Sequence, residues 1–570
     1  MSGWFDDYAA PEGVYDEVFA ADRSVRPSSA RLAETLAELD AEDIRARVEY
    51  VQRTYTDQGV TFDLGGQETT FPLDIVPRVI GADDWAGVEA GVTQRVLALE
   101  KFLADVYAEG RLFDDDVMPR HVVTSSRHFH RVVHGLSPVN DVRIHVAGVD
   151  LIRDTDGRFR VLEDNVRVPS GVSYVMTNRR AVSAALPEVT SRHRIRSVQE
   201  YPRRLIAALT DCAPRGVSDP TVVVLTPGVY NSAYFEHALL ARMMGCELVE
   251  GRDLVCQNGN VSVRTTRGLR PVHVIYRRVD DEFLDPAHFR ADSLLGVAGL
   301  LSAARRGNVT IANAVGNGVA DDKLVYSYVP DLIRYYLGEE PLLPAVDTWR
   351  LEEPAHREEV LDRLGELVVK PVDGSGGKGI VIGPAADRAT LDALRARVIA
   401  DPRGWIAQPL VQLSTVPTMI DGKLAPRRVD LRPFAVNDGS GVWVLPGGLT
   451  RVALPEGEMI VNSSQGGGSK DTWVLAAPFP RPVLVIAEPA TPPDPLATSP
   501  TTSPTSSPTD APPSPGEAEK VEVPPLEQFV AGEITPQQEQ EQQQQQQRQR
   551  QLEQQRQSRR CEATKGVASC

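Results

Sequence analysis

The chain has 570 residues, a hydrophobic content of 42% and a formal net charge of −17. Such a length predicts several domains with real cores, and the acidic charge argues against nucleic-acid or membrane-surface binding, which usually needs a basic patch. The five cysteines form no C-x-x-C pair and no metal-ligand spacing, so we expect a reducing compartment. Without a signal peptide or a run of about 18 apolar residues, the sequence predicts a cytoplasmic protein.

Residues 1–120 are expected to form a mainly helical N-terminal region. The segment "VTQRVLALEKFLADVYAEG" (92–110) has apolar residues at helical spacing and ends on a glycine, which predicts an amphipathic helix that stops at Gly110. In the next region, 121–200, the period changes to that of strands. The runs "VRIHVAGVDLI" and "RFRVLEDN" are separated by Asp156-Gly157, a strong signal for a β-hairpin.

Residues 215–300 are predicted to form an α/β domain on the substrate side. The segment "TVVVLTPGVYNSAYFEHALLARMMGCELVEG" (221–251) is typical of strand, helix and strand, and indicates a parallel sheet. "PVHVIYRRVDDEF" (271–283) adds a strand with polar residues at its carboxyl end, where ligand sites of α/β folds tend to lie. Arg277, Arg278 and Asp280 are therefore candidates for gripping a carboxylate substrate, and an exposed strand end is the alternative.

The stretch "VVKPVDGSGGKGIVIG" (368–383) contains the densest group of glycines in a region, 301–477, that we expect to bind a nucleotide. It lacks the first glycine of a Walker A loop, and "GIVIG" is too short and β-branched to open the helix of a dinucleotide fold. A kinase would need its lysine after the loop, with H-R-D and D-F-G, and the chain has neither triplet. What remains is a β-hairpin whose backbone amides approach phosphates above Lys370, or a surface hairpin with a solvated lysine.

The predicted hairpin of region 121–200 carries three hard oxygen donors. Glu163 and Asn165 are two residues apart, so they point to one face of a strand, and Asp150 lies across the turn. Such donors suit Mg²⁺ shared with nucleotide phosphates. The alternative is a hairpin that simply exposes a polar face.

Together these motifs resemble the ATP-grasp superfamily, whose members clamp ATP between two α+β lobes. The matching phrases are "VVKP" and "GSGGKG" for the lysine and loop, "AQPLV" (407–411) for the hinge strand and "VDLI…VLEDN" for the metal strands. The metal motif precedes the lysines, as in circularly permuted members such as eukaryotic-type glutathione synthetases and glutathionylspermidine synthetase. "LEDNVRVPSGVSY", "YRRVDDEFLDP" and "NSSQGGGSKDTW" look like the bacterial circularly permuted ATP-grasp family of undefined substrate, over residues 60–475.

The resemblance implies a circularly permuted ATP-grasp fold, of the α+β or α/β class, with an inserted α/β domain similar to a pre-ATP-grasp domain. It implies ATP and Mg²⁺ as cofactors, with Lys323 of "NGVADDKLVYSYVP" and Lys370 on the phosphates. The covering loop would be Gly374, Ser375, Gly376, Gly377, Lys378 and Gly379. The hinge residues Gln408 and Leu410 would meet adenine, Asp150, Glu163 and Asn165 would hold Mg²⁺, and Arg167 or Arg432 would stabilise the transferring phosphoryl group.

Two residues depart from the family pattern, and several others carry open alternatives. Gln408 stands where many hinges have an acidic residue, and Asp373 is an additional carboxylate that could join the metal site. Other polar residues with more than one interpretation are His128, His130 and His134, for which a metal site is disfavoured without acidic or cysteine ligands, and Ser170, Gly171 and Ser173, which either bind substrate or form a turn. The segment "NSSQGGGSKD" (462–471) is expected to lie outside the core, as a second active-site loop rather than a linker.

The function that these features predict is an ATP- and Mg²⁺-dependent ligase that joins a carboxylate to an amine through an acyl phosphate. Its partners would be the two small substrates, with no nucleic acid and no membrane. The alternative is a non-catalytic nucleotide-binding scaffold whose tail recruits a partner. That tail, residues 478–570, is rich in Pro, Ser, Thr and Gln, and this composition predicts disorder, with a possible protein partner at its Gln-rich tract.

Overall fold

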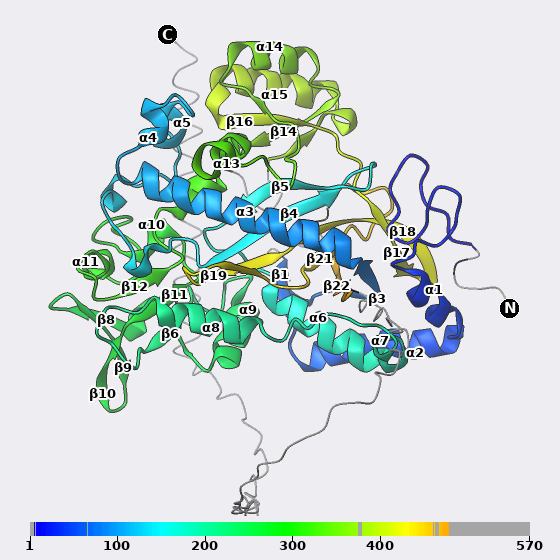
Figure 1. The fold of residues 1–570 in the computed structure, drawn as a ribbon, viewed down its shortest axis with the longest axis horizontal. Coiled ribbons are helices and arrows are strands. Elements are labelled where there is room, and N and C mark those ends of the chain that lie inside the picture. The colour runs from blue at the N-terminus through cyan, green and yellow to red at the C-terminus, as the bar shows by residue number, and fades with distance from the viewer. Residues whose placement is uncertain are drawn as a thin grey trace, which may run out of the picture. The chain divides into compact units, whose positions relative to one another are not determined.

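A large mixed β-sheet forms the centre of the described chain (Figure 1). The computed structural model describes residues 5, 7–64, 67–373, 379–459, 461 and 467–477, which belong to one contact unit, Met1–Arg481. Along the central sheet the strand order is β20-β19-β4-β18-β21-β22-β3, with β17 paired to β18 and β5 paired to β4. The strands are β3 (Leu73–Ile80), β4 (Val146–Arg153), β5 (Phe159–Asn165), β17 (Thr415–Ile420), β18 (Lys423–Arg432), β19 (Phe434–Asn437), β20 (Val442–Val444), β21 (Leu449–Val452) and β22 (Gly468–Val474).

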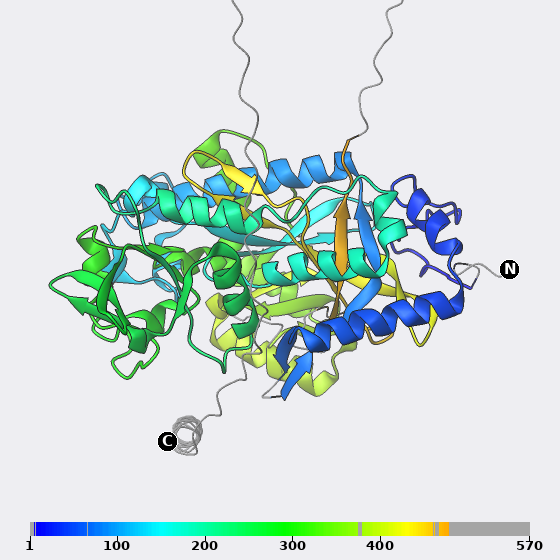
Figure 2. The same cartoon turned by 90° about the horizontal axis from the view of Figure 1, so that it is seen from below.

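At one edge of this sheet, the last strand of the described chain lies next to an early one. β22 pairs with β3 in parallel, and the two strands run side by side as the orange and blue arrows of Figure 2. The prediction that "NSSQGGGSKD" lies outside the core is wrong for residues 468–471, and residues 462–466 lie outside the described residues. The buried ammonium group of Lys470 has a partner for each of its N–H donors, which offsets the cost of removing its charge from water. It forms an ion pair with Asp74 and donates to the carbonyls of Val76 (3.1 Å) and Pro417 (3.0 Å).

The β4–β5 hairpin confirms the predicted turn and sets the two faces of β4. Gly157 has φ 78°, and a Cβ added there would lie 2.6 Å from the Tyr15 ring, so this turn requires glycine. Val149 and Leu151 belong to the same apolar core as Phe102 of α3 (Ala82–Val106). Since side chains alternate along a strand, Asp150 lies on the opposite face from this core.

The predicted α/β unit is confirmed as a second, parallel sheet in the order β12-β11-β6-β7. Its strands are β6 (Val222–Leu225), β7 (Glu247–Val249), β11 (Val274–Arg277) and β12 (Thr310–Ala312). The connection from β6 to β7 contains α9 (Tyr234–Met244), the helix that the sequence placed there. A small antiparallel sheet follows, made of β8 (Leu254–Gln257), β9 (Asn260–Thr265) and β10 (Gly268–Val272).

A third sheet, in the order β13-β16-β14-β15, carries the lysine and hinge motifs. Its strands are β13 (Trp349–Arg350), β14 (Leu367–Pro371), β15 (Val381–Ile382) and β16 (Trp405–Pro409), and its own apolar core includes Val360 of α14 (Pro354–Asp362) and Leu394 of α15 (Arg388–Ala400). β14 and β15 pair antiparallel through Val369 and Val381, so the strands that flank the glycine stretch form the predicted hairpin. Residues 374–378 between them lie outside the described residues.

The remaining elements surround these sheets. The predicted helix of residues 92–110 is the carboxyl part of α3, which ends at Val106, and Gly110 follows with φ 69°. The other helices and strands are α1 (Ala30–Ala37), α2 (Ala41–Asp57), β1 (Thr61–Leu64), β2 (Gln67–Thr70), α4 (Arg111–Asp114), α5 (Arg120–Thr124), α6 (Val172–Ala185), α7 (Pro187–Ser191), α8 (Tyr201–Asp211), α10 (Asp281–Leu284), α11 (Leu300–Arg305), α12 (Lys323–Tyr326) and α13 (Val329–Leu337). Among the described residues, no helix has the length and apolar content needed to cross a bilayer.

The predicted tail, residues 478–570, lies outside the described residues, and the domain boundaries given above stay predictions. Truncation after Ala477 is expected to leave thermal stability and nucleotide binding nearly unchanged, because so polar a segment contributes few apolar contacts. Differential scanning calorimetry of the full and truncated chains checks this. An insoluble truncated chain, or one that melts many degrees lower, would show that the tail contributes to folding.

Candidate functional site

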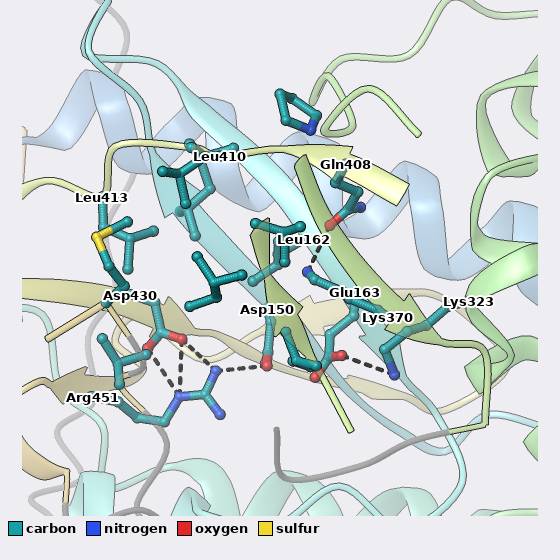
Figure 3. A pocket seen from close by; sticks show the side chains of 18 of the residues that line it. Asp150, Leu162, Glu163, Lys323, Lys370, Gln408, Leu410, Leu413, Asp430 and Arg451 are labelled. Atoms are coloured by element: carbon teal, nitrogen blue, oxygen red, sulfur yellow. Dashed lines mark hydrogen bonds and ion pairs between the residues drawn. The ribbon is translucent and has the colours of Figure 1, made fainter. Parts of the chain in front are cut away.

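A cavity lined by several of the predicted residues lies between the β4–β5 hairpin and the third sheet (Figure 3). We call it the nucleotide cavity. The space free of protein atoms is about 970 Å³, part of it open to solvent. It is lined by Asp150, Ile152, Leu162, Glu163, Lys323, Val368, Lys370, Pro371, Ile380, Ile382, Gln408, Pro409, Leu410, Val411, Leu413, Asp430, Arg451, Met459 and Val461.

Asp150 and Glu163 face each other across the hairpin. They are direct partners in the antiparallel register of β4 and β5, next to a bulge that follows Asp150. The neighbouring Asp164 points the other way and accepts two hydrogen bonds from Arg95 of α3, from Nε at 2.6 Å and from Nη2 at 2.7 Å. This buried bidentate pair fixes β5 against α3, and it thereby holds Glu163 toward the cavity.

Asp150 is fully buried in a network of arginines. Its Oδ2 accepts hydrogen bonds from Arg432 Nη2 and from Arg451 Nη2, both at 2.7 Å, and Arg451 also pairs with Asp430. Burial by itself would raise the pKa of Asp150, but Arg432 and Arg451 together hold it well below its usual value. Asp150 is therefore an anion at neutral pH, and Arg432 is engaged by it rather than free in the cavity.

Glu163 is the more accessible of the two carboxylates, with 29% of its side chain exposed. Its Oε2 lies 3.4 Å from Lys323 Nζ, and its Oε1 lies 3.9 Å from Arg432 Nη2. Lys323 is held beside it at the start of α12, where its backbone N–H donates to the Val372 carbonyl at 3.0 Å. This hydrogen bond connects the start of α12, which carries Lys323, to the residue that follows β14, the strand that carries Lys370.

Lys370 lies on β14 and donates a 2.6 Å hydrogen bond to Gln408 Oε1 (Figure 3). Gln408 in turn donates to Thr348 Oγ1 at 3.0 Å, so its side chain orients Lys370. Burial lowers the pKa of Lys370 to about 8, with Lys323 acting in the same direction and Glu163 opposing it. Below that pH the cavity contains two ammonium groups beside Glu163.

The rest of the nucleotide cavity is apolar and lies beside the hinge strand β16. Leu162, Val368, Ile382 and Leu413 supply aliphatic surface, and Leu410 follows the end of β16. A slot with aliphatic walls at one end and two lysines with a carboxylate at the other matches a flat base joined to a phosphate chain.

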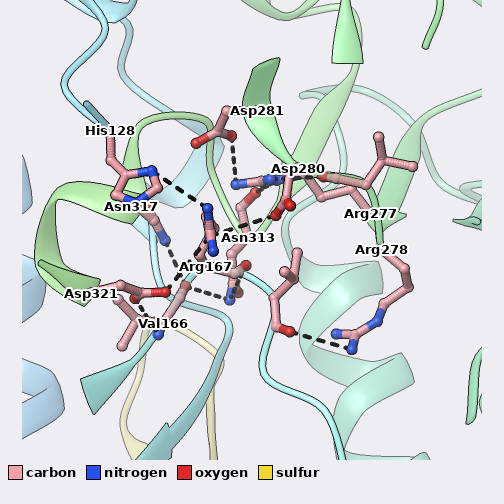
Figure 4. A network of polar contacts seen from close by, with 12 residues as sticks. His128, Val166, Arg167, Arg277, Arg278, Asp280, Asp281, Asn313, Asn317 and Asp321 are labelled. Carbon is pink, nitrogen blue, oxygen red and sulfur yellow. Dashed lines mark hydrogen bonds and ion pairs between the residues drawn. The ribbon is translucent and has the colours of Figure 1, made fainter. Parts of the chain in front are cut away.

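A second cavity, of about 620 Å³ and partly open to solvent, is lined by Arg167, and we call it the polar cavity. Figure 4 shows the polar contacts of Arg167 and its neighbours. Arg167 does not line the nucleotide cavity. Its Nη1 lies 3.4 Å from His128 Nδ1, and its Nε lies 3.5 Å from Asp280 Oδ1 and 3.7 Å from Asp321 Oδ2. Burial raises the pKa of Asp321 to about 7. The polar cavity is lined by Arg127, His128, His130, Arg167, Asp280, Asp281, Glu282 and Asp373.

Two residues predicted to contact substrate make hydrogen bonds within the fold. Arg277 is 0% exposed, and its guanidinium donates to the carbonyls of Asn313, Val279 and Ala314 at 2.8–3.0 Å. Ser173 is also 0% exposed, and its hydroxyl donates to Glu236 at 2.9 Å. The polar atoms of both residues are engaged by the protein itself, and a role for either in substrate binding stays a prediction.

Arg278 and Ser170 meet near the same carboxylate. Arg278 Nη2 donates to Ser170 Oγ at 2.6 Å and lies 3.3 Å from Glu236 Oε1. Glu236 also accepts from the backbone of Gly171 (2.7 Å) and of Ser173 (3.1 Å), so it caps the start of α6. The turn interpretation therefore fits Gly171, which has φ 116°.

The three histidines of residues 128–134 do not share one location. His128 and His130 line the polar cavity, whereas His134 Nε2 lies 3.0 Å from the Ala108 carbonyl. Over the part of the chain that the structure describes, no group of three or more His, Cys, Asp or Glu side chains is placed to hold a metal. Asn165 lies two residues beyond Glu163 and pairs with Gly148, and its buried Nδ2 makes no hydrogen bond.

Sequence reasoning missed Arg451 and Asp430. They are partners in the register of β18 and β21, and together with Arg432 they surround Asp150. A weak signal was present, since Asp430 and Arg432 are two apart in "RRVDLRPF" and thus share a face of one strand. For Arg451 the sequence alone offered no signal, because its partner lies on another strand.

Along the chain the β4–β5 hairpin precedes Lys323 of α12 and Lys370 of β14, the permuted order that the sequence predicts for an ATP-grasp protein. Residues 77–453 match the family model described as circularly permuted ATP-grasp type 2, and the chain belongs to this family. An uncharacterized protein of Mycobacterium tuberculosis is 61% identical over 463 residues, which cover 81% of this chain and 84% of that protein. An uncharacterized protein of Synechocystis is 48% identical over 469 residues, covering 82% and 98% of the two chains.

Two further similarities bear on fold and chemistry. A Frankia casuarinae protein named "Putative glutamate--cysteine ligase 2-2" is 46% identical over 464 residues, which are 81% of this chain and 53% of that longer protein. The solved structure of a glutathione synthetase-like effector from Globodera pallida has a TM-score of 0.51 at 11% identity, covering 77% of this chain and 98% of that one. That likeness is one of fold alone.

Proposed function

We propose that the protein is an ATP- and Mg²⁺-dependent ligase that joins a carboxylate to an amine. The observation that carries the proposal is the meeting of Lys323, Lys370 and Glu163 at the polar end of a cavity whose other end is aliphatic. Membership of the ATP-grasp family and the ligase name of the Frankia relative support the same class of reaction.

In this proposal the aliphatic half of the nucleotide cavity holds adenine, beside the backbone of Gln408 and Leu410. Lys323 and Lys370 bind the phosphates, and the predicted loop Gly374–Gly379, of which only Gly379 is described, covers them. Two ammonium groups at this place offset the charge of the phosphate chain. Their electrostatic attraction to the phosphates is stronger than in water, because the site is partly buried.

The donor set beside the lysines fits Mg²⁺, which prefers carboxylate and amide oxygens. Glu163 is the accessible donor, Asp150 lies opposite it, and Asn165 follows two residues on. When bound, the ion would supply positive charge that offsets the charge of the transferring phosphoryl group. Because Arg432 and Arg451 already occupy Asp150, we expect Glu163 to contribute most to binding the ion.

The chemistry proceeds in two balanced steps. A carboxylate oxygen of the acid attacks the γ-phosphorus of ATP, the bond to the β-phosphate oxygen breaks, and ADP leaves with an acyl phosphate formed. The amine first releases a proton to solvent and then attacks the acyl carbon; the bond from that carbon to the phosphate oxygen breaks, inorganic phosphate leaves, and the second amine proton passes to the phosphate or to solvent. The lysines stabilise the first step, and Arg432 or Arg167 is the candidate for stabilising the phosphoryl group in transit.

The proposal is tested by phosphate release. Pooled small carboxylic acids and amines are incubated with the full chain, ATP and Mg²⁺, and active pools are divided until one acid and one amine remain. We expect release that needs both substrates and stops in EDTA. A chain that binds ATP yet releases no phosphate with any pool would instead favour a non-catalytic nucleotide-binding scaffold.

The pKa of Lys370 predicts a pH dependence of nucleotide binding. Burial lowers this pKa from 10.5 to about 8, so the ammonium group is present below pH 8 and is lost as the pH rises through that value. The affinity for Mg-ATP should therefore fall above pH 8, by up to about tenfold per pH unit. Calorimetric titration between pH 7 and 9.5 measures it. Lys370→Arg should flatten the profile, because arginine stays charged, and an equally steep fall in that variant would contradict the assignment.

A further inference from the structure

We propose that the polar cavity binds the amine substrate in its ammonium form. The inference rests on the proposed ligase function and names the site and charge of one substrate, a small organic cation with a primary amino group. The alternative from the sequence, in which Arg277, Arg278 and Asp280 grip a carboxylate, loses its main cation because Arg277 is closed off by three backbone carbonyls.

Charge is the first argument. Four carboxylates line the polar cavity, from Asp280, Asp281, Glu282 and Asp373. Three guanidinium groups lie against them: Arg127 is 3.1 Å from Asp373, Arg167 is 3.5 Å from Asp280, and Arg277 is 2.8 Å from Asp281, which leaves one carboxylate in excess. The two histidines add no positive charge, because burial and the nearby arginines lower the pKa of His128 to about 4, and burial lowers the pKa of His130 as well. The lining therefore carries an excess of negative charge, which favours a cationic ligand.

Unsatisfied polar atoms are the second argument. Asp281 is a buried side chain, 4% exposed, whose Oδ1 accepts no hydrogen bond although it lies 2.8 Å from Arg277. The Asp280 side chain is 41% exposed, but its Oδ1 atom is closed to solvent and accepts no hydrogen bond, at 3.5 Å from Arg167. Buried carboxylate oxygens are normally hydrogen-bonded, and the three N–H groups of an ammonium ion would supply donors to both residues.

Position is the third argument. Asp373 lines the polar cavity three residues after Lys370 and directly before the predicted phosphate-covering stretch 374–378. Arg167 reaches the same cavity from the segment after β5, the strand that carries Glu163. A ligand in the polar cavity would thus lie beside the two segments that lead to the phosphate end of the nucleotide cavity, where an attacking amine has to approach.

The test compares three four-carbon compounds that differ in charge: 1,4-diaminobutane, 1,4-butanediol and succinate. Each is titrated into the full chain with Mg²⁺ and a non-hydrolysable ATP analogue, and binding is followed by ligand-observed NMR. We expect the diamine to bind, and the diol and succinate to bind at least about tenfold more weakly, the loss expected when charge-assisted hydrogen bonds are removed. Equal binding of the diol, tighter binding of succinate, or no binding of the diamine would overturn the proposal.

Variants locate the bound diamine. Asp280→Asn and Glu282→Gln should each weaken diamine binding by about tenfold and leave binding of the ATP analogue unchanged. Asp392→Asn, on the exposed face of α15, is the matched control and should change neither. Unchanged diamine affinity in both cavity variants would refute the site. Because this readout needs no turnover, failure of the ligase proposal, seen as absent phosphate release, is distinguished from failure of the cavity.

Discussion

Replacement of Lys370 by alanine is expected to weaken binding of Mg-ATP by about tenfold to a hundredfold, the range for loss of a hydrogen bond to a charged group. The reason is local, because Lys370 lies near Lys323 and Glu163, at the end of the nucleotide cavity where we propose that the phosphates bind. Thermal stability should not fall, since burial already disfavours the charged form of this side chain. Isothermal titration calorimetry measures the affinity.

Two controls separate this effect from general loss of charge. Lys423→Ala removes an exposed lysine of β18, and His130→Ala alters the polar cavity, and both should bind Mg-ATP as the parent chain does. Equal ATP affinity with and without Lys370 would remove the basis for placing the phosphates at this end of the cavity.

Glu163→Gln is expected to lower the rate of phosphate release by roughly a hundredfold or more, since a neutral amide is a poorer ligand for Mg²⁺ and stabilises less charge. The fold should remain, because Glu163 is partly exposed and the neighbouring Asp164 keeps β5 attached to Arg95. Rates are measured against Mg²⁺ concentration, and melting temperatures are compared.

Glu358→Gln, at an exposed position of α14, is the matched control and should keep the full rate. A Glu163→Gln chain with the parent rate at the same Mg²⁺ concentration would show that the carboxylate does not serve the metal. So would full activity of the parent chain in EDTA.

Local patterns predicted the elements that carry the candidate site. Asp156-Gly157 between two alternating runs indicated the hairpin, and the period of two placed Glu163 and Asn165 on one face, with Asp150 across the turn. The register of β4 and β5 then shows Asp150 directly opposite Glu163. The β-branched run after the glycine stretch likewise indicated a strand, which pairs with β14. Short-range rules suffice here because both partners lie within one hairpin.

Interactions between distant strands were not predictable from the sequence. Lys470 and Asp471 look like loop residues, yet they lie in a buried strand because Asp74 and Arg179, hundreds of residues earlier, form ion pairs with them. The pattern of Arg277 also gave no sign that the backbone near Asn313 would occupy its guanidinium. Burial of a charge depends on its partner, and the partner is set by tertiary structure.

The most direct test of the central claim, ligation through an acyl phosphate, follows oxygen from the acid. Once the acid and amine are identified, the acid is labelled with ¹⁸O in its carboxylate, and the products are examined by ³¹P NMR and nucleotide chromatography. Ligation through an acyl phosphate predicts ADP and inorganic phosphate as products, with one ¹⁸O atom transferred from the acid to each phosphate. AMP with pyrophosphate, or phosphate without the label, would contradict it.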